Sequence, residues 1–514
     1  MEGVASALSL ADLCIRYGNL LVQTCKSYKH ADQEIRESIL LIETLWLKIQ
    51  RQLELLRNIW DTLDDDYQIH QNGVLQVLQG KAQAAIASID QVVGDSKEGS
   101  TMRSMMSKKG EYKRLKYATW VKSSLKSVML DLKEWAEVFD ISWYLIIRQS
   151  SSKLDQELQP VSIAEDGPLS ILKDLRDTIH ENLRGQIAAG NSSVYLSEDF
   201  FEEKRAPFSH SEAEIVYEAG GDARFLLDQE SSISSLSDSC KLARILQKVD
   251  PFTFGILSCR GVLETEGSSR RFAFSIPPNL EQPEFLRFLL VSGSQFQPLD
   301  DRLEIAKQLA KSVMFVHSAG FVHKNIRPET VLILRSVYSE SSFSFLVGFE
   351  SFRYEEGRTE LLGDDIWERN LYRHPTRQGV FPEMAYTMQH DIYSLGVCLL
   401  EIGIGESLVV FESETGAPQA SPLISGVVNF TIKDNKKRAF EIKRALVKMA
   451  RDQLPPKMGR KYAETVVTCL TCLDKDDNSF GDEKEFLDEN SVVVGVRFIE
   501  KVSIYAKSSV QMLV

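Results

Sequence analysis

The sequence predicts a multidomain chain in which an all-α N-terminal helical bundle precedes an α+β domain of two lobes. Through the first 150 or so residues, apolar side chains recur at steps of three and four, and no β-rich run interrupts them. From about residue 216 short strand-like runs come first and helical runs follow, an order typical of an α+β fold. We therefore expect a bundle at 1–158, a linker with one brace helix at 159–215 and an α+β domain at 216–510.

The predicted bundle begins with an amphipathic helix at 8–25. Its apolar residues fall on one face at helical spacing: Leu10, Leu13, Cys14, Tyr17, Leu20, Leu21 and Cys25. A second helix is predicted at 30–63, a third at 73–93 after the polar segment LDDDYQ, and one or two more at 115–147. Helices that each carry one apolar face bury it by packing together, so an antiparallel bundle follows.

A basic segment at 96–116 interrupts the predicted helices. It contains seven Lys and Arg residues against two Glu, and the cations that we single out are Arg103, Lys108, Lys109, Lys113, Arg114 and Lys116. Such a segment can contact an anionic surface, although a flexible solvated connection between helices has the same composition.

Composition narrows the setting and the partners of the chain. The N-terminus, MEGVASALSLADL, has no basic region, and no apolar run reaches the roughly 18–20 residues of a transmembrane helix. Seven scattered cysteines favour reduced thiols in the cytoplasm. The net charge is −13, and residues 1–160 carry 20 Lys and Arg against 21 Asp and Glu. The acidic excess therefore lies in the C-terminal part, which argues against general nucleic-acid binding.

Four motifs in the second half resemble protein-kinase elements in their usual order. FVHKNIRPETVLIL (321–334) resembles the catalytic loop, His-Arg-Asp-Leu-Lys-Pro-Glu-Asn followed by an apolar strand. FLVGFESF (345–352) resembles the metal-binding Asp-Phe-Gly element, and YRHP (372–375) lies where the segment ending in Ala-Pro-Glu is expected. HDIYSLGVCLLEIG (390–403) resembles the buried helix that anchors the large lobe. The resemblance covers about 216–505 and implies a bilobal protein-kinase-like fold.

Several positions of these motifs keep the kinase pattern, and we expect structural roles for them. His323 takes the place of the loop histidine, and Pro328 and Glu329 follow in the loop as they do in kinases. Asp391 corresponds to the structural aspartate of the buried helix. Arg327 matches the loop lysine and is the one conservative exchange.

The positions that carry phosphoryl transfer depart from the kinase pattern. Asn325 replaces the catalytic aspartate, and its neutral amide cannot accept a proton from a substrate hydroxyl. Thr330 replaces the metal-binding asparagine of the loop. At the Asp-Phe-Gly site the chain reads Gly348-Phe349-Glu350, so the metal-binding aspartate is a glycine, and Glu350 is the one nearby residue able to substitute as a ligand.

The small lobe lacks its nucleotide-binding groups as well. No Gly-x-Gly-x-x-Gly occurs, the expected third strand ARFLLDQESS has no lysine, and the predicted helix at 232–249 has no glutamate to pair with one. We therefore predict a pseudokinase, with no metal and no cofactor expected and with ATP binding doubtful.

The helical half resembles fungal HeLo domains, the prion-inhibition-and-propagation family. The resemblance covers about 1–158 and rests on LSLADLCIRYGNLLVQTCKSYK and the helices after it, together with LKYATWVKSSLKSVMLDLKEWAEVFDISWYLII. In architecture, a bundle, a brace and a pseudokinase, the chain is similar to the mixed-lineage-kinase-domain-like proteins of necroptosis.

This resemblance implies a regulated cell-death or self/non-self signalling protein. The helical domain would form homo-oligomers, move from the cytoplasm to the plasma membrane and perturb anionic lipid, under control of the pseudokinase and an upstream receptor or kinase partner. The first helix supplies the membrane-active candidates: Leu10, Leu13, Ile15, Tyr17, Leu20 and Leu21. Two alternatives stay open, namely a non-catalytic oligomerising scaffold and an atypical active protein kinase.

Overall fold

The computed structural model forms two compact units, Met1–Lys173 and Asp174–Val514. The described residues are 2–26, 33–63, 65–97, 123–133, 147, 152–159, 168–183, 194–229, 236–264, 269–292, 298–338, 341–354, 363–412, 414–428 and 432–474. The division between the units falls inside helix α6 (Pro168–Leu183), the helix expected as a brace.

The described residues of the first unit lie almost entirely in helices, as its sequence predicts. Its elements are α1 (Glu2–Lys26), α2 (Gln33–Ile59), the short 3-10 helix η1 (Trp60–Thr62), α3 (Asp65–Lys97) and α5 (Ser152–Leu158), with a further helical stretch at 123–133. α1 packs against both α2 and α3, and α2 packs against α5.

Two helices of the first unit begin earlier than the sequence analysis placed them. α1 begins at Glu2 instead of residue 8, and α3 begins at Asp65, inside the LDDDYQ segment that we expected to be a break. Acidic residues in a first helical turn face the positive end of the helix dipole, so polar residues extend these helices instead of ending them.

The apolar face of α1 lies in the core of this unit. Among the membrane-active candidates Leu10 and Leu21 are buried, Leu13, Ile15 and Tyr17 are partly buried, and Leu20 is 44% exposed. Among the described helices, none has an apolar stretch long enough to cross a bilayer. The six cationic candidates of the basic segment, Arg103 to Lys116, lie outside the described residues.

α1 and α2 meet at a glycine. A β-carbon on Gly18 would lie 2.0 Å from the ring of Trp46, so no larger residue fits there without a shift of the ring. The indole N–H of Trp46 donates a 2.8 Å hydrogen bond to the side-chain oxygen of Asn19 on α1. This contact fixes the two helices at close distance.

The second unit opens with a six-stranded sheet. Its strands are β1 (Tyr195–Leu196), β2 (Phe201–Pro207), β3 (Glu214–Glu218), β4 (Arg224–Leu227), β5 (Cys259–Glu264) and β6 (Arg270–Ser275), in the spatial order β1-β5-β6-β4-β3-β2. All neighbours are antiparallel except β1, which runs parallel to β5. Helix α7 (Leu236–Leu246) follows β4 and packs against β5.

This sheet begins inside the segment that we expected to be a linker. β1, β2 and the first residues of β3 lie within 159–215. The sequence analysis did not predict β2. It is an edge strand with the sequence FEEKRAP, and every residue after Phe201 is exposed. Without a buried face it has no alternating pattern to detect.

The other described residues of the second unit lie mainly in helices. It contains α8 (Pro251–Phe254), α9 (Leu286–Ser292), α10 (Leu299–Ser318), α11 (Trp367–Asn370), α12 (Met388–Ile404), α13 (Pro422–Ser425), α14 (Asn435–Met458) and α15 (Arg460–Thr471). A sheet in the order β10-β9-β7 accompanies them, formed by β7 (Leu280–Phe285), β9 (Val331–Ser336) and β10 (Ser342–Leu346). Strand pairs β8 (Phe321–Val322) with β11 (Arg353–Tyr354), and β12 (Val409–Phe411) with β13 (Pro418–Ala420), complete it.

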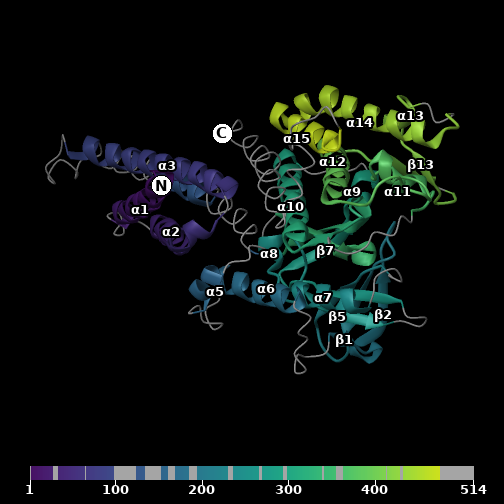
Figure 1. Ribbon diagram of the computed structural model, residues 1–514, viewed down its shortest axis with the longest axis horizontal. Helices are drawn as coiled ribbons and strands as arrows, with labels where there is room; N and C mark the ends of the chain where they lie inside the picture. The colour runs from purple at the N-terminus through teal and green to yellow at the C-terminus, as the bar shows by residue number, and fades with distance from the viewer. Residues whose placement is uncertain are drawn as a thin grey trace, which may run out of the picture. The chain divides into compact units, whose positions relative to one another are not determined.

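The second unit therefore has two parts, as predicted. Figure 1 shows β1, β2, β5 and α7 at one end of it and the helices α10, α12, α14 and α15 at the other. α12 is buried along nearly its whole length and packs against α10, α14 and α15. Strands followed by helices confirm the α+β fold, and a buried central helix gives the second part its core.

Candidate functional site

The HKNIRPE loop is fixed by a carboxylate on the buried helix α12. Asp391 accepts hydrogen bonds from the backbone N–H groups of His323 and Lys324, at 2.7 and 2.9 Å. His317 Nε2 and the Tyr386 hydroxyl contact the same carboxylate at 3.1 and 3.0 Å. Burial alone would raise the pKa of Asp391, but the hydrogen bond of His317 and the nearby histidine rings lower it overall. Asp391 thus lies where the sequence analysis expected a structural aspartate, and it orders the loop.

His323 is a packing residue of this loop. Its ring is fully buried, lies 4.7 Å from the ring of Phe349 between centroids, and accepts a 3.3 Å hydrogen bond at Nδ1 from the backbone N–H of Asn325. Burial lowers the pKa of His323 to about 4, so the ring is neutral near pH 7.

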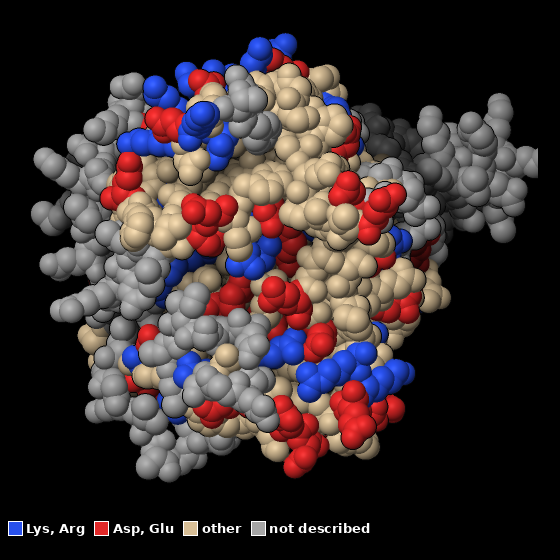
Figure 2. Space-filling model, turned by 90° about the vertical axis from the view of Figure 1, so that its right-hand side faces the viewer, with Lys and Arg blue, Asp and Glu red and all other residues tan. Residues whose placement is uncertain are grey.

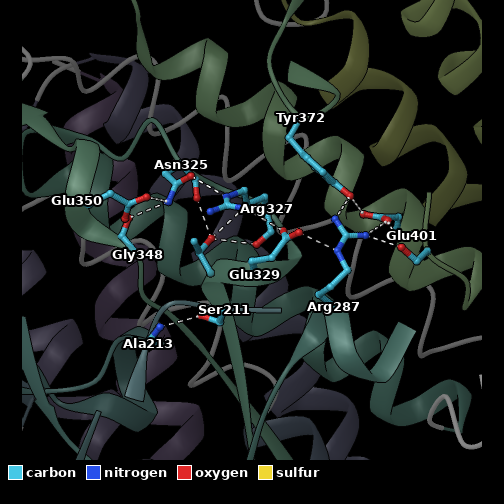
Figure 3. A network of polar contacts seen from close by, with 12 residues as sticks. Ser211, Ala213, Arg287, Asn325, Arg327, Glu329, Gly348, Glu350, Tyr372 and Glu401 are labelled. Carbon is cyan, nitrogen blue, oxygen red and sulfur yellow. Dashed lines mark hydrogen bonds and ion pairs between the residues drawn. The ribbon is translucent and has the colours of Figure 1, made fainter. Parts of the chain in front are cut away.

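The side-chain amide of Asn325 forms hydrogen bonds through both its nitrogen and its oxygen. Its Nδ2 donates to a carboxylate oxygen of Glu350, and also lies 3.4 Å from the carbonyl oxygen of Gly348. Its Oδ1 accepts a 2.9 Å hydrogen bond from Arg327 Nε. Figure 3 shows these groups converging from the loop and from the segment after β10. Both polar atoms of the Asn325 side chain, at the position where a catalytic aspartate was expected, are therefore hydrogen-bonded to other residues of the protein.

The two metal-ligand positions pack against each other. Thr330 is fully buried, and its hydroxyl lies 2.8 and 2.9 Å from the carbonyl oxygens of Asn325 and Arg327. Gly348 has φ +86°, and a β-carbon there would lie 2.3 Å from Thr330 Cγ2. The glycine is thus required by both its left-handed backbone and its neighbour, and a side chain at 348 would displace Thr330.

A carboxylate that the sequence analysis did not select lies behind this glycine. Asp228, at the end of β4, is buried and accepts hydrogen bonds from the backbone N–H groups of Gly348 and Phe349, at 2.8 and 2.9 Å. Gln229 N–H donates to its other oxygen at 2.9 Å. Burial raises the pKa of Asp228 despite these donors.

Glu350 is the second carboxylate of this site. Burial, followed by the nearby charge of Asp228, raises the pKa of Glu350 to about 8, while Arg327 opposes the rise. The two acids therefore favour a state in which one of them is protonated near neutral pH. On the strand side, the group that β4 contributes to this site is the carboxyl of Asp228.

A buried arginine joins the loop to the large helical part. Arg287, fully buried at the start of α9, donates Nε to Glu329 at 2.9 Å and lies 3.2 Å from Glu401 on α12 through its terminal nitrogen. The Tyr372 hydroxyl receives a 2.5 Å hydrogen bond from Arg287 and donates to Glu401 at 2.8 Å; Ser407 also accepts from Arg287 (Figure 3). Glu329, the loop glutamate, thereby has its pKa lowered against the effect of burial, chiefly by Arg287.

The turn between β2 and β3 contacts the second part of the unit through two rings. Its residues Phe208 and His210 contact elements of the second part: Phe208 lies edge-on to Phe285 at 4.8 Å, and His210 stacks on Phe411 at 3.8 Å between centroids. His210 has φ +64°, a left-handed conformation that is uncommon outside glycine and asparagine. This turn is therefore filled with rings and packed against β7 and β12.

The structure brings the degenerate loop positions together in one site. His323, Asn325, Arg327 and Thr330 meet the Gly348–Glu350 segment, with Pro328 and Glu329 buried beside them. Sequence reasoning missed Asp228 and Arg287. Each has a signal in the sequence, since Asp228 ends the apolar run FLL and Arg287 interrupts the apolar run FLRFLLV. A lone charge inside an apolar run indicates a buried ionic contact.

The similarities to known proteins agree with this geometry. No protein-family model matches the chain. A protein kinase and PP2C-like domain-containing protein of Arabidopsis thaliana is 25% identical over 250 residues, which is 44% of this chain and 34% of that protein. A probable serine/threonine-protein kinase kinase of Dictyostelium discoideum is 24% identical over 31% of this chain and 38% of its own length. A probable serine/threonine-protein kinase of Saccharomyces cerevisiae is 25% identical over 24% of this chain and 36% of its own length.

The chain thus spans about a third of the length of these relatives. Together with the fold, they define the C-terminal part as a protein-kinase-like domain with distant kinase relatives. None of these proteins assigns a family to the helical first unit, and its resemblance to HeLo domains stays a prediction.

Proposed function

We propose that this chain is a non-catalytic signalling protein whose kinase-like domain is a pseudokinase. The proposal depends chiefly on one observation: both polar atoms of the Asn325 side chain are already hydrogen-bonded within the protein. Phosphoryl transfer needs a carboxylate at this position to orient the nucleophile and accept its proton, and here a neutral amide is held between Glu350 and Arg327.

The residues around this loop do not fit magnesium and ATP. A buried Asp228 on the strand side repels phosphate where kinases place a lysine, and Gly348 offers no metal ligand. A carboxylate oxygen of Glu350, the one acid able to substitute, already accepts from Asn325. The ring-filled turn at 208–213 further supports a domain that binds no nucleotide.

In the finer form of the proposal, the kinase-like domain restrains a helical unit that oligomerises and perturbs anionic membranes, as in regulated cell death. The amphipathic α1 and the basic segment at 96–116 support a membrane role. Because the apolar face of α1 is now inside the bundle, α1 must leave its contacts with α2 and α3 before that face can meet lipid. The runner-up is a scaffold that self-associates without acting on lipid.

The catalytic part is tested with purified full-length chain in a phosphorylation assay with radiolabelled ATP and magnesium, in parallel with a thermal shift measurement. We expect no phosphate incorporation and a Tm unchanged by magnesium ATP. Magnesium-dependent incorporation that is lost in Glu350→Gln would establish an atypical active kinase and overturn the proposal.

The membrane part is tested by dye release from phosphatidylserine vesicles, comparing the full chain with the unit 1–173. Leakage should be stronger for the unit alone, since it lacks the restraining domain. Leu20→Asp should reduce it, while Leu40→Asp, a matched change at an exposed leucine of α2, should not. Self-association without leakage in every arm would favour the scaffold instead.

A further inference from the structure

The long helix α14 is strongly basic within an acidic chain. It carries eight Lys and Arg residues against Glu441 and Asp452, whereas the chain as a whole has a net charge of −13. Figure 2 shows Lys and Arg side chains along the upper edge of one face, at the height at which Figure 1 places α14. The kinase-like site described above uses none of these residues.

A groove of about 720 Å³ lies along this helix, between it and the end of α15. Phe440 and Val447 contribute apolar lining, and Arg444, Lys448 and Arg451, which also line it, follow one another along α14 at helical steps of four and three. A volume of this size is within the range of pockets that bind drug-sized ligands or a few residues of peptide.

At the base of the groove, a buried lysine is held by polar side chains. Lys443, only 4% exposed, lines it and is held by Asp474 and by His374 Nε2 at 3.0 Å. Burial, followed by the charge of Lys443, lowers the pKa of His374 to about 2, so this ring stays neutral and accepts from the ammonium group. The lysine is thereby fixed in one orientation at the base.

Two of the cations that line the groove form no ion pair with a described residue. Arg444 pairs with Glu441 at the rim, and the Lys443 charge is matched by Asp474. Lys448 and Arg451 are exposed, and no ion pair to either is found within the described parts of the chain. The groove lining contains the four cations Lys443, Arg444, Lys448 and Arg451 against the two acids Asp452 and Asp474, so positive charge exceeds negative charge beside Phe440 and Val447.

We propose that the α14 groove binds an acidic peptide segment of a partner protein. Carboxylate or phosphorylated side chains of the peptide pair with Lys448 and Arg451, and an apolar side chain between them rests on Phe440 and Val447. The recessed lysine at the base disfavours a flat bilayer, and the net charge of −13 disfavours a nucleic acid. The proposal does not depend on whether the kinase-like site is catalytic.

The test uses the full-length chain and a fluorescein-labelled peptide of alternating Glu and Leu, followed by fluorescence anisotropy at about 50 mM salt. The same peptide with Gln for Glu is the neutral probe. We expect binding of the acidic peptide alone, and we expect the double variant Lys448→Glu/Arg451→Glu to weaken it by about tenfold or more, which corresponds to about 1.4 kcal/mol.

The matched control is Lys433→Glu/Lys437→Glu, which changes the net charge equally at exposed positions outside the groove. It should leave the affinity within about twofold. An equal loss in both variants, or equal binding of the neutral peptide, would overturn the groove as the site. Competition by inorganic phosphate or phosphatidylserine vesicles as strong as that by unlabelled peptide would replace the peptide by a free anion or a lipid, and would overturn the proposal too.

Discussion

The substitution Glu350→Gln tests whether the pKa of this buried glutamate is raised in the folded chain. The pKa of Glu350 rises from 4.5 to about 8 because burial and the neighbouring Asp228 disfavour its charged form. Between these two pH values the folded state binds more protons than the unfolded state, so the free energy of unfolding falls as pH rises through this window. At about 1.4 kcal/mol for each pKa unit, the ionised side chain costs on the order of 5 kcal/mol at pH 8.

Glutamine keeps the acceptor for Asn325 and cannot ionise. The variant should therefore match the original chain near pH 5 and exceed its stability near pH 8, with Tm higher by up to roughly 10 °C. The assay is thermal unfolding of the full chain followed by circular dichroism from pH 5 to pH 8. Part of the pH dependence should remain in the variant, because the pKa of Asp228 is raised as well.

The control is Glu202→Gln, a matched change at an exposed position of β2. It should leave the pH profile unchanged. If Glu350→Gln and the control gave the same profile as the original chain, Glu350 would be ionised in the folded state, and the reasoning about two competing buried acids would be wrong.

Three further substitutions test the packing of the two units, each by chemical denaturation with circular dichroism. Arg287→Met leaves two carboxylates buried without their cation and should cost about 3–5 kcal/mol, whereas Arg444→Met at the surface should cost less than about 1 kcal/mol; equal losses would contradict the buried network. Asp228→Ala removes the acceptor of two buried N–H groups and should destabilise the kinase-like unit by about 1–3 kcal/mol, so an unchanged midpoint would count against that contact. Gly18→Ala places a methyl group against Trp46 and should destabilise the helical unit by about 1–3 kcal/mol, with the emission of that indole shifted.

The sequence was most informative where the pattern is local. Helical periodicity predicted helices in the first unit; α2 lies close to the range expected for it, and α6 lies within the segment expected to hold the brace helix. Motif order predicted the kinase-like fold, because the loop, the strand after it and the buried helix each leave a continuous signature. The periodicity could not fix the helix ends, since α1 and α3 begin at the acidic residues Glu2 and Asp65, ahead of their apolar patterns.

The sequence by itself determined which residues stand in the kinase-like motifs, with Asn325 where a catalytic aspartate is expected and Gly348 where a metal-binding aspartate is expected, since identity at a motif position needs no coordinates. Only the tertiary structure decided what fills their place. Asp228 reaches the Gly348 backbone from a strand 120 residues away, and Arg287 joins Glu401 across 114 residues. The edge strand β2 likewise forms because it pairs with β3, and its own composition does not predict it. Contacts between distant segments depend on how the whole chain packs, and no local pattern records them.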